Sequence, residues 1–251
     1  MRVPSGADID KADFGIILNY PFYHHIIDNF LDTQRAKAVS QEFPDYHSNV
    51  WYCYNNPLEN KKTCNNWYNF GPETYKLLCY LNSTEFVSYL QKVTGISKLY
   101  PDIGLHGGGL HIHGTEGKLN VHLDYSIHPK LHLQRKLNLI LYLTEGWDFS
   151  WGGGLELWSH DKENNRPQEK VVTIENVFNR AILFDTTQNS WHGFPDPIKC
   201  PEKVYRKSLA VYYLTDPQKG TDPRPRALYA PTKEQKTDQS ILNLIQERAK
   251  L

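Results

Sequence analysis

The sequence has little cysteine, a single methionine and no long apolar run. The longest apolar runs, such as Leu209 to Leu214, fall far short of the roughly 20 residues that cross a bilayer. This excludes an integral membrane protein built on apolar helices. The cysteines are too widely spaced for CxxC zinc pairs or a dense disulfide framework, so free buried thiols are expected. They are Cys53, Cys64, Cys79 and Cys200.

A surplus of charge of either sign is also absent. The 251 residues contain 28 Lys plus Arg and 28 Asp plus Glu. This balance provides no drive for salt-dependent binding to nucleic acid or an anionic membrane, so we expect neither partner. The segment Met1–Asp13 is acidic and lacks the apolar stretch of a signal peptide, which favours a cytoplasmic location.

Aromatic residues are plentiful, with 6 Trp, 16 Tyr and 10 Phe, and they suit a sheet-built core or pocket. No repeat or Gly/Ser linker divides the chain. We therefore expect a single domain over residues 1–220, with helical support at about 20–100 and a β core at about 101–216. Residues 221–251 are expected to form a Pro-rich tail and an amphipathic helix that packs on the domain.

The hydrophobic pattern changes near Pro101. Before it, helical spacing predicts two short helices within 23–43, with Asp32-Thr33 as a cap, and two more at 73–81 and 83–94, while 49–72 reads as irregular. After it, short β-type runs are separated by Gly, Asn and Pro. These runs are Gly109–His113, Leu119–Leu123, Leu137–Leu143, Gly154–Trp158, Val171–Ile174, Ala181–Asp185 and Lys207–Leu214. The pattern favours an α+β fold with an antiparallel double-sheet core of jelly-roll type, N-terminal supporting helices and a C-terminal helix.

The first candidate for chemistry is His122-Leu123-Asp124, because residues i and i+2 of a strand share one face. A His-x-Asp pair is common by chance, so it indicates a metal site only together with five segments that follow it in the chain. In chain order, these are the run 136–143, the turn 152–154 leading into Leu155-Glu156-Leu157, the run 179–185, Trp191-His192-Gly193, and Arg206-Lys207-Ser208. This ordered set resembles the Fe(II)- and 2-oxoglutarate-dependent dioxygenases, in particular the prolyl 4-hydroxylase-like branch with its double-stranded β-helix.

The resemblance implies that His122, Asp124 and His192 are the catalytic metal ligands. Two imidazoles and one carboxylate on one face of an octahedron hold Fe(II) and leave adjacent positions open for a bidentate oxoacid and O2. The implied cofactors are therefore Fe(II), with 2-oxoglutarate and O2 as cosubstrates. A requirement for ascorbate stays open.

Arg206 would be costly to place facing a core unless an anion meets it. The resemblance implies that its partner is the distal carboxylate of 2-oxoglutarate, which a planar guanidinium fits. Ser208 lies on the same face and can donate a further hydrogen bond, whereas Lys207 points to the opposite side.

Further cosubstrate contacts are less specific. Tyr142 occupies a place where relatives present a phenol, and Asn138 lies on its face, but either could simply fill the barrel. His113 stands nine residues before His122, where relatives commonly have a tyrosine, so it either donates in its place or the register differs. We expect four other histidines to be structural or solvent-facing, namely His111, His128, His132 and His160. The aromatic residues Tyr125, Trp147, Trp151 and Trp191 lie near strand ends, where they could grip a proline-containing peptide or form a bland rim.

The resemblance implies a hydroxylase of an unactivated C–H bond that releases succinate and CO2, with peptidyl proline as the first candidate substrate. A protein or peptide partner is implied by that interpretation. The alternative within the enzyme class is a hydroxylase of a small molecule, such as a free amino acid, a sugar or another metabolite. The alternative from another class is a non-catalytic, cupin-like binding protein.

Overall fold

The computed structural model describes residues 16–187 and 189–250, so the acidic segment Met1–Asp13 lies outside the described residues. The helices are α1 (Thr33–Gln41), α2 (Pro72–Leu81), α3 (Thr84–Thr94) and α4 (Gln239–Ala249). The first seven strands are β1 (Ile16–Leu18), β2 (His24–Ile27), β3 (Tyr52–Asn56), β4 (Glu59–Cys64), β5 (Tyr100–Pro101), β6 (Gly109–His113) and β7 (Lys118–Leu123). The others are β8 (Gln134–Tyr142), β9 (Leu155–Asp161), β10 (Arg166–Ile174), β11 (Ala181–Asp185), β12 (His192–Phe194), β13 (Arg206–Thr215) and β14 (Leu228–Tyr229).

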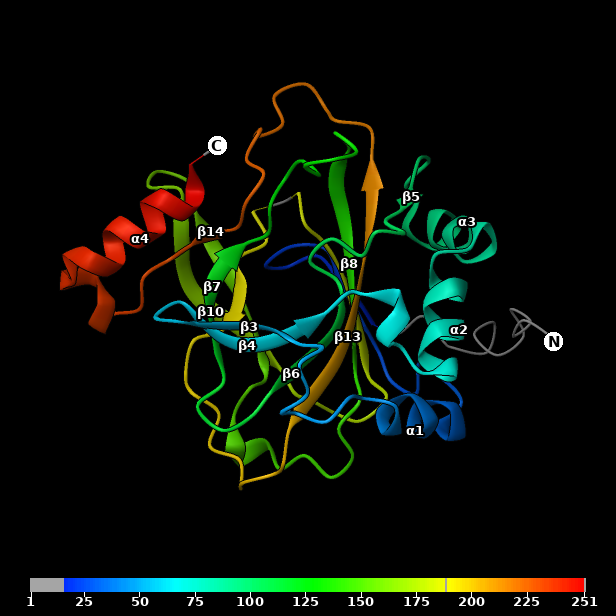
Figure 1. Ribbon diagram of the computed structural model, residues 1–251. Coiled ribbons are helices and arrows are strands. Elements are labelled where there is room, and N and C mark those ends of the chain that lie inside the picture. Colours follow the sequence, from blue (N-terminus) through cyan, green and yellow to red (C-terminus); the bar gives the residue numbers. More distant parts are fainter. Residues whose placement is uncertain (1–15, 188, 251) are drawn as a thin grey trace.

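The strands form one antiparallel sheet that curls on itself (Figure 1). Its order is β1-β2-β11-β8-β13-β6-β4-β7-β12-β9-β10, with β14 on β7, β3 on β4 and β5 on β13. Strands β2, β11, β8, β13 and β6 form one wall, and β7, β12, β9 and β10 form the other. This arrangement confirms the expected jelly-roll core of antiparallel strands with supporting helices.

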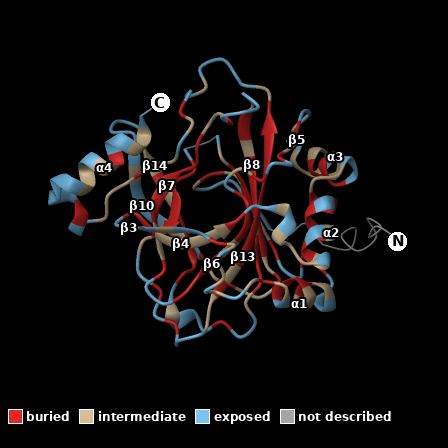
Figure 2. Cartoon of the chain, in the orientation of Figure 1, coloured by how far each residue is buried: buried red, intermediate tan, exposed pale blue. Residues whose placement is uncertain are grey.

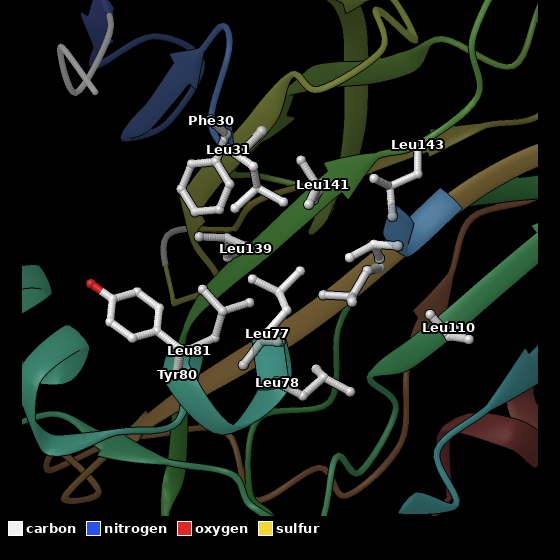
Figure 3. Packing of buried hydrophobic residues seen from close by; sticks show 14 of the residues in the cluster. Phe30, Leu31, Leu77, Leu78, Tyr80, Leu81, Leu110, Leu139, Leu141 and Leu143 are labelled. Carbon is white, nitrogen blue, oxygen red and sulfur yellow. The ribbon is translucent and has the colours of Figure 1, made fainter. Parts of the chain in front are cut away.

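Helices α1, α2 and α3 lie against the outer face of the β8–β13 wall (Figure 1), and their buried sides face the sheet (Figure 2). Leu137, Leu139 and Leu141 of β8 point into this interface, as do alternate residues of β13. Figure 3 shows Leu77 and Leu81 of α2 beside Leu139, and Leu31 beside Leu141. Because side chains alternate along a strand, the intervening residues of both strands face the opposite way.

The predicted helix ends are largely confirmed. Asp32 caps α1 by accepting hydrogen bonds from the backbone N–H groups of Gln34 and Arg35. Ser83 caps α3, which ends at Gly95 in the left-handed conformation. These ends were readable because a cap depends on local residues only.

The prediction for the rest of the first hundred residues is wrong in two places. His24–Ile27, expected in a helix, is strand β2, which pairs residue by residue with β11. The segment expected to be irregular contains the hairpin β3–β4, and β4 also pairs with β6 and β7. Both segments are short and their composition is ambiguous, so the pairing of β2 with β11, and of β4 with β6 and β7, decides their conformation.

The described cysteines are all free, as expected, but only Cys64 and Cys200 are buried. The expectation of burial is wrong for Cys53 and Cys79, which are exposed. Within the described ranges, each helix is too short or too polar to reach across a bilayer.

The C-terminal segment closes one side of the barrel. Strand β14 pairs with β7, so Tyr229 lies opposite His122. Helix α4 packs through Ile245 against Leu58 and Tyr229. Near the end of α4, Arg248 forms a 2.7 Å ion pair with Glu59, which Lys61 also contacts at 3.0 Å. The segment from 221 thus packs on the core, and the domain boundary near residue 220 stays a prediction.

Glycine is required at Gly109, at the start of β6. Its φ is +88°, and a Cβ there would overlap the carbonyl oxygen of Cys64 on β4. We predict that Gly109→Ala lowers the free energy of unfolding by about 3 kcal/mol or more. Gly220 is the matched control, because its φ is +84° with open space around it. Gly220→Ala should cost only about 1 kcal/mol. Equal losses in denaturant unfolding would contradict the close approach of β4 and β6.

Glu59 is buried, and its charge anchors α4. Burial alone would raise its pKa, but Lys61 and Arg248 outweigh burial and lower the pKa from 4.5 to about 2. Because the pKa is lower in the folded protein, the ionised Glu59 stabilises the fold at pH values above its unfolded-state pKa of 4.5. This contribution disappears as the pH falls towards 2. Near neutral pH, we therefore predict that Glu59→Gln costs about 3 kcal/mol of unfolding free energy.

The difference in unfolding free energy between the wild-type protein and Glu59→Gln should narrow as the pH falls from about 4.5 to about 2. Urea unfolding across this range measures it, with the exposed Glu163→Gln as the control. A gap independent of pH would show that the Glu59 carboxylate does not carry the contribution.

Candidate functional site

A cavity of about 760 Å³ opens between the two walls of the barrel. Arg206, Ser208, Ala210 and Tyr212 of β13 line it, as alternate residues on one strand face. From β8, Asn138 and Ile140 line it in the same way; from β6, His111 and His113 do so. The cavity is therefore lined by the face of each strand that turns away from the helices.

His122, Asp124 and His192 come together on one side of this cavity. The three are buried, and their potential ligand atoms lie within 4.8 Å of one another. His122 Nε2 is 3.7 Å from one carboxylate oxygen of Asp124, and His192 Nε2 is 4.0 Å from the other. The antiparallel pairing of β12 with β7 places His192 directly opposite His122.

The backbone holds both imidazoles in a suitable orientation. His122 Nδ1 is 3.0 Å from the carbonyl oxygen of Asn120, and His192 Nδ1 is 2.7 Å from that of Ser190. A carbonyl can only accept, so each Nδ1 donates, and in the neutral form of either ring the Nε2 lone pair then faces Asp124. Burial, with neighbouring His122, lowers the pKa of His192 to about 4, which keeps this ring neutral. Neutral imidazoles and an ionised carboxylate are the states that bind a metal.

Asp124 is ionised despite its burial. Burial alone would raise its pKa, but Arg135 at 3.3 Å and the two histidines lower it well below its usual range. The Tyr212 hydroxyl also donates to the same oxygen as Arg135, at 3.4 Å. Arg135 lies between the rings of Tyr125 and Tyr212, with 3.4 and 3.2 Å from its guanidinium carbon to the ring centroids. It is therefore held in place as the cation beside this carboxylate.

Arg206 is buried on the same lining and carries no carboxylate partner among the described residues. Its Nε donates to the Gly153 carbonyl at 2.8 Å and to Asn176 Oδ1 at 3.1 Å. The rings of Tyr142 and Phe194 flank the guanidinium. Burial lowers the pKa of Arg206, but a guanidinium remains charged in proteins. A buried cation without an anion is costly, so this position fits a carboxylate supplied by a ligand.

Of the other predicted cosubstrate residues, Tyr142, His113 and Ser208 lie near Arg206, and Asn138 lies near the metal cluster. Ser208 is buried and lines the cavity, whereas Lys207 points away and donates to the Ser40 carbonyl, as alternation requires. Asn138 lies near the metal cluster, where its amide nitrogen is 3.4 Å from Asp124. The Tyr142 hydroxyl, Asn138 Oδ1 and both ring nitrogens of His113 are buried without a hydrogen bond of good geometry in the described chain. Buried polar atoms without a partner in the chain are the groups that a polar ligand would engage.

Two expectations about the surroundings need correction. Of the four aromatic residues expected at the mouth, Tyr125 lines the cavity, whereas Trp147 and Trp191 are buried in apolar clusters and Trp151 packs beside Trp147. His111, expected to be structural or solvent-facing, lines the cavity, and burial with nearby Lys61 and Arg206 lowers its pKa to about 3.

Sequence reasoning missed Arg135, Tyr212 and Tyr229. Tyr212 could have been found, because it follows Arg206, Ser208 and Ala210 on the same strand face. Arg135 belongs to no motif, and only the folded chain places it beside Asp124. Tyr229 stacks on His122, at 5.2 Å between ring centroids, and reaches it from the C-terminal tail.

The residues fit a divalent metal and a dicarboxylate in one cavity. Two imidazoles and one carboxylate are the donor set that suits Fe(II), and Arg206 with Ser208 offers a carboxylate site on the same lining. The donor set therefore supports Fe(II) and 2-oxoglutarate as the groups bound here.

The metal assignment predicts that substitutions of two cavity histidines, His192 and His111, differ in their effect on metal binding. We predict that His192→Gln weakens anaerobic Fe(II) or Mn(II) binding by more than about 100-fold, since it removes a ligand. His111→Gln is the matched control, because His111 lines the same cavity outside the cluster and should retain binding. Calorimetric titration measures both variants. Comparable losses in the two would remove the cluster as the metal site.

Comparison with known proteins agrees with this geometry. Residues 108–215 match the model of the 2OG-Fe(II) oxygenase superfamily. The Prolyl 3-hydroxylase OGFOD1 of Mus musculus is 25% identical over 200 residues, which cover 77% of this chain and 33% of the relative. The chain thus spans about a third of the length of that curated relative.

Solved structures share the fold at low sequence identity. A Trichoplax adhaerens prolyl hydroxylase, in complex with a hypoxia inducible factor peptide fragment, is 18% identical with a TM-score of 0.53, covering 76% of this chain and 83% of its own. A Pseudomonas putida prolyl-4-hydroxylase is 14% identical with a TM-score of 0.52, covering 84% and 98% respectively. A Phytophthora capsici prolyl 4-hydroxylase is 19% identical with a TM-score of 0.54, covering 98% and 72%.

Proposed function

We propose that this chain, whose residues 108–215 belong to the 2OG-Fe(II) oxygenase superfamily, is a 2-oxoglutarate-dependent dioxygenase that hydroxylates a prolyl residue in a protein or peptide. One observation carries the proposal. The cluster His122, Asp124 and His192 faces the same cavity as Arg206, a buried guanidinium without a carboxylate partner in the described chain. A metal site alone is common, but its combination with an anchor for a dicarboxylate is specific to this chemistry.

His122, Asp124 and His192 would hold the iron, and Arg206 with Ser208 would hold the distal carboxylate of 2-oxoglutarate. When bound, the iron and cosubstrate couple the conversion of 2-oxoglutarate and O2 into succinate and CO2 to the insertion of one oxygen atom into a C–H bond. The protein supplies orientation and exclusion of water. Tyr142 and Phe194 flank the guanidinium, so the carboxylate it binds is shielded from solvent.

Arg135 and Tyr212 act as positioning residues. They contact one carboxylate oxygen of Asp124, whereas the other faces His192 and accepts from the Asn138 amide at 3.4 Å. The stacking of Tyr229 on His122 similarly limits the movement of that ring. These contacts hold the three ligand side chains together before any metal binds.

The prolyl substrate is supported by the activities printed for the similar proteins, one of which holds a peptide. A non-catalytic, cupin-like role is less well supported, because a scaffold has no use for a buried, uncompensated Arg206. The small-molecule alternative is tested with the same assay, by offering free amino acids and sugars beside proline-containing peptides.

The cosubstrate anchor is tested by comparing adjacent residues on β13. We predict that Arg206→Gln weakens 2-oxoglutarate binding by about 30-fold or more, since it removes one partner of a buried charge pair. Lys207→Gln, which changes the outward-facing neighbour, should bind 2-oxoglutarate normally. Anaerobic titration with Fe(II) present measures the affinities.

Succinate release then tests the activity itself. The wild-type protein is expected to form succinate with Fe(II), 2-oxoglutarate and O2, and mass spectrometry should detect one added oxygen atom on the substrate. Asp124→Ala should form none. Tight metal and 2-oxoglutarate binding without succinate across peptides and metabolites would favour the scaffold instead.

A further inference from the structure

The cavity lining is strongly cationic in a chain with no net charge. Lys61, Arg135, Arg206, Arg226 and Arg248 all line it. The carboxylates in the same lining are only Glu59 and Asp124. Burial and the nearby cations lower the pKa values of His111 and His113, so these two rings add no charge to the count. The described lining therefore carries a surplus of three positive charges.

The groups of the proposed reaction do not remove this surplus. Arg135 is paired with Asp124, and Arg206 is assigned to the cosubstrate. Iron contributes two positive charges and 2-oxoglutarate two negative charges, so the sum is unchanged when both are bound. Arg135, Arg206 and Asp124 together account for one positive charge of the surplus. The other two lie elsewhere in the lining.

These two charges involve residues from three separate segments. Lys61 of β4 and Arg248 of α4 share the single carboxylate of Glu59, which leaves one charge uncompensated. Arg226 precedes β14, is exposed, and has no ion pair among the described residues. Cations gathered in a concave site focus a positive potential that attracts anions.

Aromatic faces accompany these cations. Lys61 lies 4.9 Å from the ring centroid of Tyr54, and Arg248 lies 5.1 Å from that of Tyr229. Tyr52, which also lines the cavity, packs against Tyr54 with 4.8 Å between ring centroids. An apolar ring, such as that of proline, can pack on the exposed ring of Tyr52 while an adjacent anion meets the cations.

We propose that the substrate carries an anionic group, a carboxylate or phosphate, close to the reacting C–H bond, and that Arg226, with Lys61 and Arg248, binds it. In a peptide this group is an aspartate or glutamate beside the target proline. The inference rests on the proposed function and specifies its substrate class. Arg226 is the specificity-determining residue, because its charge is not engaged in an ion pair within the described chain.

The experiment compares matched substrates that differ only in charge. One arm uses proline-containing peptides with Glu or Gln at each position beside the proline; the other uses carboxylated or phosphorylated metabolites and their neutral parents. We expect kcat/KM to be about tenfold or more higher for the acidic member, with the preference shrinking as ionic strength rises. Arg226→Gln should remove most of the preference, and Arg226→Glu should reverse it. Lys219→Gln, at an exposed position just before this tail and outside the cavity, is the control.

Anaerobic calorimetry with Fe(II) and 2-oxoglutarate bound measures affinity for the same pairs without turnover. Preference in the peptide arm identifies an acidic protein segment, and preference in the metabolite arm alone identifies a small acidic substrate. Equal use or equal binding of both members of every pair, including no binding by any, overturns this inference. Succinate formation with equal use of both members would leave the proposed function intact, whereas absence of succinate under all conditions counts against the function itself.

Discussion

The arrangement depends on one constraint, the commitment of alternate side chains on β8 and β13 to opposite faces of the wall. Leu139 and Val211 lie on the face covered by the N-terminal helices, and Asn138 and Tyr212 lie on the face that lines the cavity. The apolar face packs in the hydrophobic core and stabilises the wall. The residues of the opposite face can therefore be polar without weakening that core. A one-residue shift in register would exchange the two faces and destroy both.

Charge compensation is uneven within the cavity, and the uneven places indicate function. Asp124 has Arg135 beside it, and Glu59 has Lys61 and Arg248. These carboxylates are fully compensated by the protein. Arg206 is not, although an uncompensated buried charge costs several kcal/mol. A fold retains such a charge at a place where a ligand completes the pair, which distinguishes this cavity from a merely polar interior.

Local rules recovered part of the structure. The capping of α1 by Asp32, the shared face of Arg206 and Ser208, and the opposite direction of Lys207 depend only on neighbours in the chain. The strands β2 and β4 could not be recognised, because they pair with segments that lie far along the chain, and β3 forms as the hairpin partner of β4. Similarly, no motif marks Arg135, which reaches the carboxylate only through the curl of the sheet.

By itself, the sequence determined which donor atoms exist and which of them share a strand face, since side-chain alternation is a local property of the backbone. Only the tertiary structure decided that His192 lies opposite His122, because the register of β12 against β7 is set by hydrogen bonds between distant segments. It also decided that the C-terminal tail lines the cavity, with Tyr229 on His122 and Arg248 on Glu59. Such contacts depend on burial of surfaces far apart in the chain, which no local pattern encodes.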